Sequence, residues 1–574
     1  MLKDNKSFTK LFKIVIIYYI GGVIKVKKNG FLSGAFVSTA GVIICKIVGL
    51  LYVIPFYQII GSQGGALYSY AYTIYSLFLT LSSQGIPAAM SKIVSEYNTK
   101  NYQWSKEKAY RIVRNLMVAL GTLWFIVMMF FAEKIAYLII GNVEGGNTIA
   151  DVALVIRCIS SALIIVPFLS TIKGYLSGHK YISLCAISNV IEQIVRVLFV
   201  LIGSYIAAHV FNFPIAITVG VAVFGATVGA FAAYLYLVVK RDKNKSLFKT
   251  NARKTIEEKN NTTKTILKRI ILTSLPFVVI EFVRSIYSIV DTFTVNSTLT
   301  SLGYSLSDSE YILSVISTWG SKINMIVIAF VSGLTLSLIP TITTSYVKGD
   351  LEDVNNKLNQ SFQIIVFVNL PLVIGLYMLA TPVWTLFYGY NELGISIFKL
   401  YVFQAISFSF YSLAIDSSQV LGKTKLALGT LFISFILKTL LNAPFMRLCS
   451  LIGINAGYGP IILNIILHFL TTFIIIFVQI KKYKISYRQS INPVLKTILI
   501  SLIMFVSLLI LELFVPVSIQ ATRINYILIS ILYALVGGTI YIYLANDNGL
   551  LKKMFGFDLK DIFNKIFKHK KIAK

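Results

Sequence analysis

Three ionisable residues interrupt an apolar stretch at positions 271–295: Glu281, Arg284 and Asp291. Steps of three and seven residues place all three on one face of a helix, with Ser288 between them. A charge at the centre of a bilayer costs roughly 2.5–3.5 kcal/mol on insertion scales. Because of that cost, the face is expected to meet protein or water rather than lipid, and it is a candidate functional site.

Charged residues also occur inside other apolar stretches. Three lysines have no acidic partner within their own stretch: Lys46, Lys322 and Lys438. A lysine near mid-bilayer cannot easily reach the interface, so a water-filled cavity is expected around these three. Glu192 and Arg196 are four residues apart and could neutralise each other on one helix, and the first two charges of the 271–295 stretch could do the same.

Basic residues outnumber acids at these intramembrane positions. A cationic cavity with low-dielectric walls attracts an anion, and phosphate is the natural one. The predicted anion-binding residues are Lys46, Arg196, Arg284, Lys322 and Lys438. The carboxylates of Glu192, Glu281 and Asp291 are candidates for binding a coupling cation, either Na⁺ or H⁺.

Sequence signals of an enzyme are absent from the chain. It has no glycine-rich phosphate loop ending in GK[ST], no HExxH and no paired cysteines, and its four cysteines lack metal-ligand spacing. A membrane glycosyltransferase would need a large outer loop bearing carboxylates, whereas the longest expected outer loops have about 20 residues. We therefore predict that the chain has no catalytic residue, no metal site and no cofactor. Its activity could instead be coupled to a Na⁺ or H⁺ gradient or to the membrane potential.

The elements that position these residues are predicted to be membrane helices. The chain has 574 residues, of which 56% are hydrophobic and only 13% charged, about half the charged fraction of a soluble domain. The expected fold is an all-α polytopic membrane protein of 14 transmembrane helices. The predicted spans are 31–57, 66–90, 110–131, 149–171, 183–205, 214–239, 269–294, 311–340, 361–381, 397–420, 426–446, 451–479, 494–516 and 523–545.

The net charge of +30 is concentrated in alternate loops. Loop 240–268 alone carries ten lysines and arginines, while the intervening loops are nearly bare except for Lys134 and Arg447. The positive-inside rule then places both termini in the cytoplasm. Because the charge lies beside the membrane, anionic lipids are the expected partners and nucleic acid is not.

Both ends of the chain carry amphipathic segments outside the predicted spans. Residues 1–30 form an N-terminal cytoplasmic extension, in which residues 14–24 are apolar but too short to span and indicate an interfacial helix. Residues 546–574 form a basic amphipathic tail that could lie on the inner leaflet or be solvated.

A weak internal repeat divides the chain. Residues 85–101 resemble 333–349, and 174–198 resemble 418–441, at a separation of roughly 245 residues. Both pairs relate spans that are six apart, which predicts parallel six-helix repeats. The expected parts are an N-lobe (31–239), the basic loop (240–268), a C-lobe (269–479) and two additional helices (480–545).

Three segments resemble a known family: residues 31–98, which begin FLSGAFVSTAGVIICK, residues 175–197 (YLSGHKYISLCAISNVIEQIVRV) and residues 285–295 (SIYSIVDTFTV). They are similar to the Firmicute MurJ-type and stage V sporulation protein B-type polysaccharide biosynthesis proteins. Those proteins belong to the multidrug/oligosaccharidyl-lipid/polysaccharide exporter superfamily. The resemblance covers most of the chain from residue 31.

This resemblance implies an outward flippase for lipid II, the undecaprenyl-pyrophosphate-linked peptidoglycan precursor, acting by alternating access in cell-wall synthesis or sporulation. Cell-wall synthesis enzymes are then possible partners. Basic residues in spans 1 and 8 line the family's cavity, and Lys46 and Lys322 stand at similar places here. The chain departs from many relatives at Val53, where they carry a basic residue.

Three alternatives stay open at the level of sequence. The first is a flippase for another polyprenyl-linked polysaccharide unit, which the sequence barely distinguishes from a lipid II carrier. The second is a multidrug or cation antiporter of the same superfamily, which predicts a cavity dominated by acids. The third is a non-transporting scaffold for cell-wall enzymes, which predicts that buried charges can be neutralised without loss of function.

Overall fold

The computed structural model describes residues 44–83, 86–141, 146–179, 181–244, 261–325, 349–517 and 522–555, with isolated positions at 41, 258, 327, 328, 342 and 346. Over these residues the chain is helical and contains no β-strand. Ten helices are long and apolar enough to cross a membrane, and a bent pair, Ile44–Leu51 with Val53–Thr80, makes up to eleven. The expectation of an all-α polytopic membrane protein is confirmed at this level.

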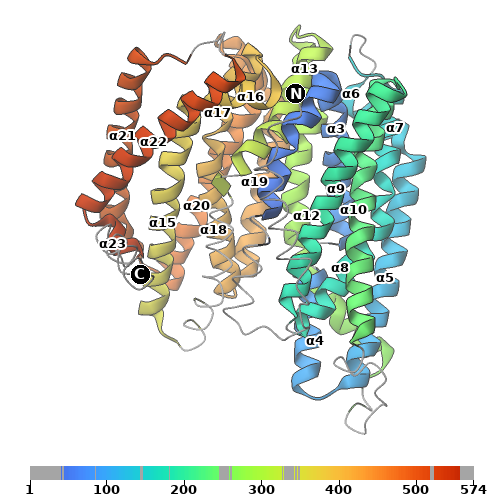
Figure 1. The fold of residues 1–574 in the computed structure, drawn as a ribbon. Helices are drawn as coiled ribbons and strands as arrows, with labels where there is room; N and C mark the ends of the chain where they lie inside the picture. Colours follow the sequence, from blue (N-terminus) through green and yellow to red (C-terminus); the bar gives the residue numbers. More distant parts are fainter. Residues whose placement is uncertain are drawn as a thin grey trace, which may run out of the picture.

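The first half of the chain forms a bundle on one side of the molecule (Figure 1). After the helix Ile44–Leu51, its elements are α3 (Val53–Ser83), α4 (Ile86–Thr99), α5 (Gln103–Phe130), α6 (Ala132–Ile140), α7 (Ile149–Ser160), α8 (Ala162–Gly178), α9 (Ile182–Tyr205), the π-helical turn Ile206–Val210 and α10 (Ile215–Lys243). We call the end of the molecule that carries the turns at 141–149 and 301–306 the outer end, following the expected topology; it is uppermost in Figure 1.

The second half forms the opposite side. Its elements are α12 (Thr263–Ser301), α13 (Leu306–Ser314), the π-helical turn Val315–Trp319, α15 (Leu351–Met378), α16 (Ala380–Tyr388), α17 (Glu392–Tyr401), α18 (Gln404–Val420), α19 (Thr424–Leu451), α20 (Gly459–Tyr483), α21 (Ile491–Phe514), α22 (Arg523–Asp547) and α23 (Leu550–Phe555). Helices α21 and α22 pack on each other and on α15 and α16, at the far edge of the molecule (Figure 1). Helical residues occupy part of every span predicted from the sequence.

Helix α3 is a hairpin of two helices rather than one straight rod. Gly61 has φ 65° and ψ −168°, which is outside the helical region and accessible at low cost to glycine alone. The hydroxyl oxygens of Tyr52 and Tyr68 are 2.9 Å apart, whereas sixteen residues of straight helix would separate them by roughly 24 Å. The turn at Gly61 falls between the predicted spans 31–57 and 66–90, as expected from the sequence.

One local geometry occurs twice in the chain. Helices α6 and α16 each have nine residues and follow a long helix through a single non-helical residue. Those residues are Phe131 (φ −97°, ψ 9°) and Leu379 (φ −92°, ψ 14°). Both short helices end at a glycine with positive φ, Gly141 (68°) and Gly389 (84°). The separation of 248 positions agrees with that of the repeat seen in the sequence.

Helix α12 has partners in both halves of the molecule. Toward the outer end it packs on α19, and it also packs on α3, α4 and α5 of the first half. At its inner end, Arg269 forms an ion pair with Glu96 of α4. Burial opposes ionisation of Glu96, but the hydrogen bonds and charges of Arg269 and Lys100 outweigh it and lower the pKa of that carboxyl. The helix that carries the charged face found in the sequence is therefore shared between the halves.

Several expectations concern segments that the structure does not describe. The N-terminal extension (1–30) with its interfacial helix, most of the basic loop 240–268, and the tail beyond α23 lie outside the described residues.

The hairpin at Gly61 leads to a first prediction. Nothing lies within 4 Å of a Cβ built at Gly61, so Gly61→Ala introduces backbone strain without a clash, and we expect a loss of about 1–2 kcal/mol. Gly375→Ala is the matched control, because this glycine is helical and equally open, and alanine there should be neutral or stabilising. Thermal unfolding in detergent measures both, and equal melting temperatures would contradict a strained turn.

Candidate functional site

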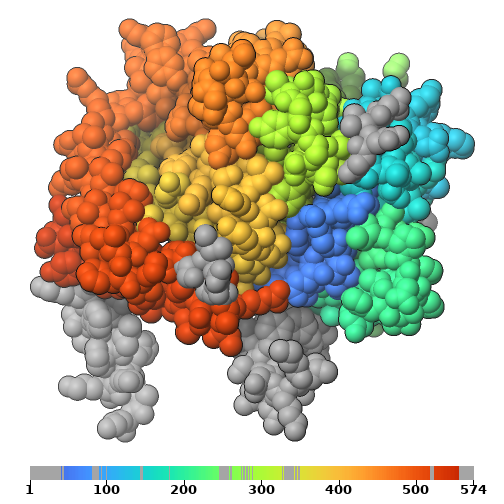
Figure 2. Space-filling model, turned by 90° about the horizontal axis from the view of Figure 1, so that it is seen from above, coloured from blue at the N-terminus to red at the C-terminus, as the bar shows by residue number. Residues whose placement is uncertain are grey.

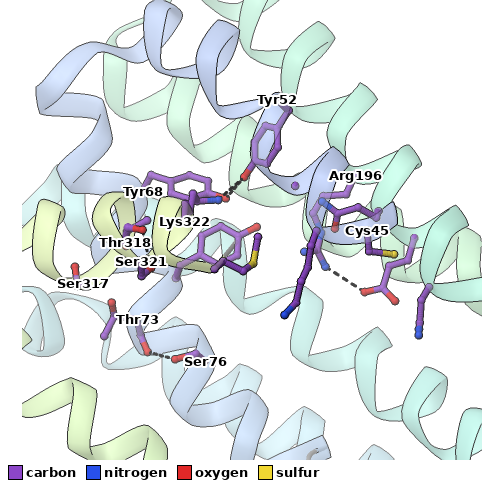
Figure 3. A pocket seen from close by; sticks show the side chains of 17 residues that line it. Cys45, Tyr52, Tyr68, Thr73, Ser76, Arg196, Ser317, Thr318, Ser321 and Lys322 are labelled. Atoms are coloured by element: carbon purple, nitrogen blue, oxygen red, sulfur yellow. Dashed lines mark hydrogen bonds and ion pairs between the residues drawn. The ribbon is translucent and has the colours of Figure 1, made fainter. Parts of the chain in front are cut away.

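A cavity of about 580 Å³ lies where the two halves of the molecule meet (Figure 3). Four stretches line it: the helix Ile44–Leu51, the second arm of the α3 hairpin, helix α9, and the segment from the π-helical turn to Met325. The described lining residues are Cys45, Lys46, Gly49, Tyr52, Tyr68, Tyr72, Thr73, Ser76, Asn189, Glu192, Gln193, Arg196, Ser317, Thr318, Ser321, Lys322 and Met325. The cavity thus combines three cations with a single carboxylate, several hydroxyls, two amides and three phenols.

Aromatic rings and one hydroxyl surround Lys322, and none of the described ion pairs includes it. Its Nζ donates a hydrogen bond of 2.9 Å to the Tyr52 hydroxyl. The ammonium also lies 4.9 Å from the ring centre of Tyr52, 5.5 Å from that of Tyr68 and 5.8 Å from that of Trp319. Each such contact contributes roughly 0.5–2 kcal/mol, depending on desolvation. The rings stabilise the positive charge without neutralising it, so the charge can still attract an anion.

The π-helical turn Val315–Trp319 precedes Lys322 by one turn. Turns of this kind interrupt α-helices most often at functional sites. Here the turn brings Ser317 and Thr318 to the cavity while Trp319 points into the protein and is fully buried. The sequence predicted one apolar span over 311–340 and gave no sign of this interruption.

On the opposite wall, one carboxylate joins two cations. Glu192 accepts from Arg196 at 3.1 Å, as the four-residue spacing predicts, and from Lys173 at 2.9 Å. Lys173 lies on α8 behind the cavity wall and neutralises the carboxylate that would otherwise offset Arg196. Lys46, which also faces the cavity, takes part in none of the described ion pairs. The described lining therefore carries a net positive charge.

Toward the outer end the cavity is sealed by four aromatic residues: Tyr57, Tyr68, Trp319 and Tyr388. The Tyr57 ring centre lies 5.1 Å from that of Trp319 and 4.9 Å from that of Tyr388, and the Tyr388 hydroxyl donates to the Trp319 carbonyl at 2.9 Å. A Cβ at Gly65 would lie 3.0 Å from Trp319 Nε1, so the close approach needs glycine. Seen from above, the α3 hairpin (blue) lies against α13 and α16 (Figure 2).

Short hydroxyl contacts join the halves below the aromatic seal. The Ser69 and Ser317 hydroxyl oxygens are 2.6 Å apart, and Thr318 donates to Ser69 at 2.8 Å. Together with the aromatic seal, these contacts close the two halves toward the outer end in this conformation. Closer to the inner end, the Thr80 and Ser285 hydroxyls are also 2.8 Å apart, so the halves meet there as well.

Lys438 corrects a prediction made from the sequence. It was expected to line the cavity, but it is fully buried within the second half, away from the cavity lining. Its Nζ donates to Asp291 Oδ2 at 2.7 Å and to Asn464 Oδ1, while Asn442 donates to Asp291 Oδ1 at 3.1 Å. Asp291, a candidate for cation coupling, is thus already neutralised by a cation of the chain itself.

The structure brings Lys46, Arg196, Lys322 and Glu192 together and separates Lys438 and Asp291 from them. The side chains of Glu281 and Arg284 lie outside the described residues, so their predicted roles stay predictions. Two features were missed in the sequence: the aromatic residues around Lys322 and the role of Lys173. The run of tyrosines at positions 68, 70, 72 and 75 was a visible signal of the first.

Comparison with known proteins shows which family the chain resembles, independently of the cavity. The family model described as polysaccharide biosynthesis protein matches residues 31–345. Over 542 residues the chain is 32% identical to the lipid II flippase MurJ of Bacillus subtilis (strain 168), covering 93% of this chain and 98% of that protein.

Two solved structures have the same fold. One is a lipid II flippase MurJ in an inward closed conformation, with a TM-score of 0.64, 16% identity, and coverage of 90% of this chain and 99% of that one. The other is an inward-facing multidrug resistance transporter of the MATE family in the MOP superfamily, with a TM-score of 0.60, 15% identity, and coverage of 78% and 99%.

The buried pair of Lys438 and Asp291 gives a second prediction. Removing one partner leaves an uncompensated charge, which costs about 3–5 kcal/mol. Lys438→Met should therefore lower the unfolding temperature in detergent strongly, and adding Asp291→Asn should recover a large part of the loss. If the double variant is no more stable than the single one, the pair does not stabilise the fold.

A third prediction concerns Lys173. Lys173→Met should weaken the binding of inorganic pyrophosphate to the purified protein on the order of fivefold, because one positive charge beside the cavity is lost. The double variant Lys173→Met/Glu192→Gln restores the net charge and should recover binding, and Lys134→Met at the exposed outer end is the control. Isothermal titration measures the affinities; unchanged affinity in Lys173→Met would show that Arg196 does not depend on it.

Proposed function

This chain belongs to the family of polysaccharide biosynthesis proteins, and we propose that it is a flippase that moves lipid II outward across the bacterial plasma membrane. Lipid II carries its peptidoglycan unit on undecaprenyl pyrophosphate. The observation that carries the proposal is the cavity between the halves, where Lys46 and Lys322 present positive charge that no described carboxylate neutralises. The protein translocates its substrate and does not transform it.

The cavity suits the head group of such a lipid. Lys46, Lys322 and Arg196 supply cations for the pyrophosphate, since ammonium and guanidinium groups are the usual phosphate binders in proteins. The Thr73, Ser76 and Ser321 hydroxyls and the neighbouring amides offer hydrogen bonds to sugars. Arg284, on the helix α12 shared by both halves, is proposed to join the pyrophosphate contacts.

The proposed mechanism is alternating access in a bundle of 14 spans with two six-helix lobes, two additional helices and both termini in the cytoplasm. The recurrence of α6 at α16 supports the repeat, and the seal at the outer end corresponds to a state closed to the outside. The lipid tail stays in the bilayer and connects to the head group in the cavity through a gap between spans 1 and 8. A groove at α21 and α22 is proposed as a second place where the tail could bind.

Transport of an anion out of a negative interior is favoured by the membrane potential, at about 2.3 kcal/mol per charge per 100 mV. If a cation gradient also contributes, Glu281 is the candidate on α12, because Asp291 is paired with Lys438 and Glu192 with two cations. The basic loop 240–268 is proposed to contact anionic lipids of the inner leaflet, and cell-wall synthesis enzymes are proposed as protein partners.

The sign of the charge in the cavity distinguishes the proposal from the principal alternatives. An exporter of organic cations needs acids in its cavity, whereas here one carboxylate faces three cations. A different polyprenyl-linked glycan would present the same pyrophosphate, and the relative at 32% identity favours lipid II among them. A scaffold without transport has no need of unneutralised charge.

Complementation tests the proposal. In a cell depleted of its own lipid II flippase, the wild-type chain should restore growth. Lys46→Ala and Lys322→Ala should not, because each removes a cation from the cavity. Lys134→Ala at the exposed outer end is the matched control, and immunoblotting verifies equal amounts in the membrane. Full complementation by both cavity variants would eliminate the cationic cavity as the substrate site.

A further inference from the structure

A buried carboxylate at the outer end joins the two halves of the molecule. Glu310 belongs to α13 in the second half and is only 3% exposed. Its Oε2 accepts from the backbone N–H of Asn147 at 3.1 Å and from Asn147 Nδ2 at 2.9 Å. Asn147 precedes α7 in the first half, and its Nδ2 also donates to the Gln63 carbonyl at 3.3 Å. One acidic side chain therefore binds the loop of the opposite half.

Other polar groups extend this contact across the interface. The Tyr70 hydroxyl of α3 faces the carboxylate of Glu310. It accepts a hydrogen bond of 2.8 Å from Asn296 of α12, whose amide also reaches the Ile139 carbonyl. The polar groups thus alternate between the two halves, and they would be separated if the outer end opened.

The carboxylate has no cationic partner among the described residues. Two other acids of the interior are compensated, since Asp291 is paired with Lys438 and Glu192 with Lys173 and Arg196. Tyr70 of α3 and Asp151 of α7 are the titratable groups that influence Glu310, and neither carries a positive charge. A cavity of about 280 Å³, lined by Ser62, Gln63, Ala66, Gly146, Ser307, Glu310 and Tyr311, lies beside it.

We propose that Glu310 and Asn147 form a proton-binding site that closes the outer end when it is occupied and favours opening when it is empty. The bound species is a proton taken from the outer solution, and the adjoining cavity gives water a path to the carboxyl. The inference goes beyond the proposed substrate, because it concerns the empty carrier.

The physical basis is the difference between the closed and open states. Glu310 lies one residue before the predicted span 311–340, and burial raises the pKa of Glu310 to about 7 in the closed state, although the Asn147 hydrogen bonds oppose the shift. In an open state the carboxyl would be hydrated and titrate near its ordinary pKa of about 4.3. A pKa that is higher in the closed state means that protonation stabilises closure, and this stabilisation is lost as the pH rises through 7.

Two details of the loop support a site built for this carboxyl. Asn147 Oδ1 is buried and has no hydrogen-bond partner, so it is an acceptor available to the O–H of a protonated Glu310 once the amide rotates. Gly146 allows the close approach, because a Cβ there would lie 2.8 Å from Glu310 Oε2 and 2.9 Å from Leu306 Cγ. Gly146→Ala should therefore hold the halves apart at any pH.

Spin labels at the outer end test the proposal in lipid nanodiscs without substrate. Labels are attached to Phe211→Cys and Leu451→Cys, both exposed and in opposite halves, after the four native cysteines are replaced by serine. Distances are measured by pulsed electron resonance between pH 5 and pH 8.5. The ratio of long to short distances should rise by up to about tenfold per pH unit below pH 7 and level off above it.

Matched variants make the result decisive. Glu310→Gln mimics the protonated form and should keep the short distance at every pH, Gly146→Ala should keep the long one, and Glu392→Gln, an exposed acid at the same end, should titrate like the wild type. A wild type that does not respond to pH, a Glu310→Gln variant that still titrates, wild-type distances in Gly146→Ala, or loss of the response in Glu392→Gln would each overturn the proposal. Because no lipid-linked substrate is present, a negative result here leaves the complementation test independent.

Discussion

The structure depends on the cost of keeping a charge in a medium of low dielectric constant. Two solutions to this cost occur in the described residues. Lys438 and Asp291 lie deep in the second half and neutralise each other with the help of two amides, which makes them part of the packing. Lys322 is instead surrounded by aromatic faces and a hydroxyl, which lower the cost of the charge but leave its field intact. The first solution is part of the packing of the second half, and the second leaves an unneutralised charge that faces the cavity.

The positions of the helices, and of the charged residues within them, could be predicted from the sequence. Hydropathy and the alternation of basic loops predicted the helices and a connection between residues 57 and 66, because lipid demands long apolar segments; that the chain turns at Gly61 was seen only in the structure. Hydropathy also predicted which charged residues would lie within membrane spans. It could not predict that Lys438 meets Asp291, since the two residues are 147 positions apart and only packing of α12 on α19 brings them together. For the same reason Lys173, which follows the predicted span 149–171, was not recognised as the second partner of Glu192.

The contacts that close the outer end are chemically modest. In the part of the chain that the structure describes, they are aromatic rings at ordinary contact distances, serine and threonine hydroxyls, and one carboxylate with its amide, rather than ion pairs. Each hydrogen bond of this kind contributes about 0.5–1.5 kcal/mol net, because water competes for both partners when the interface separates. A seal assembled from many such contacts excludes water while it is closed, yet no single contact holds the halves together against opening.

The length of helix α12 and its attachments at both ends would restrict any motion of one half against the other. With 39 residues it measures roughly 58 Å along its path, longer than the roughly 40–45 Å of a bilayer with its head groups. Its outer part is fastened to α19 through Asp291, and its inner end to α4 through Arg269. Rotation of one half against the other cannot leave both attachments at rest, so α12 must bend, slide or release one end. If the two halves do change orientation, bending α12 or breaking one of its two attachments would add to the energy barrier between the orientations.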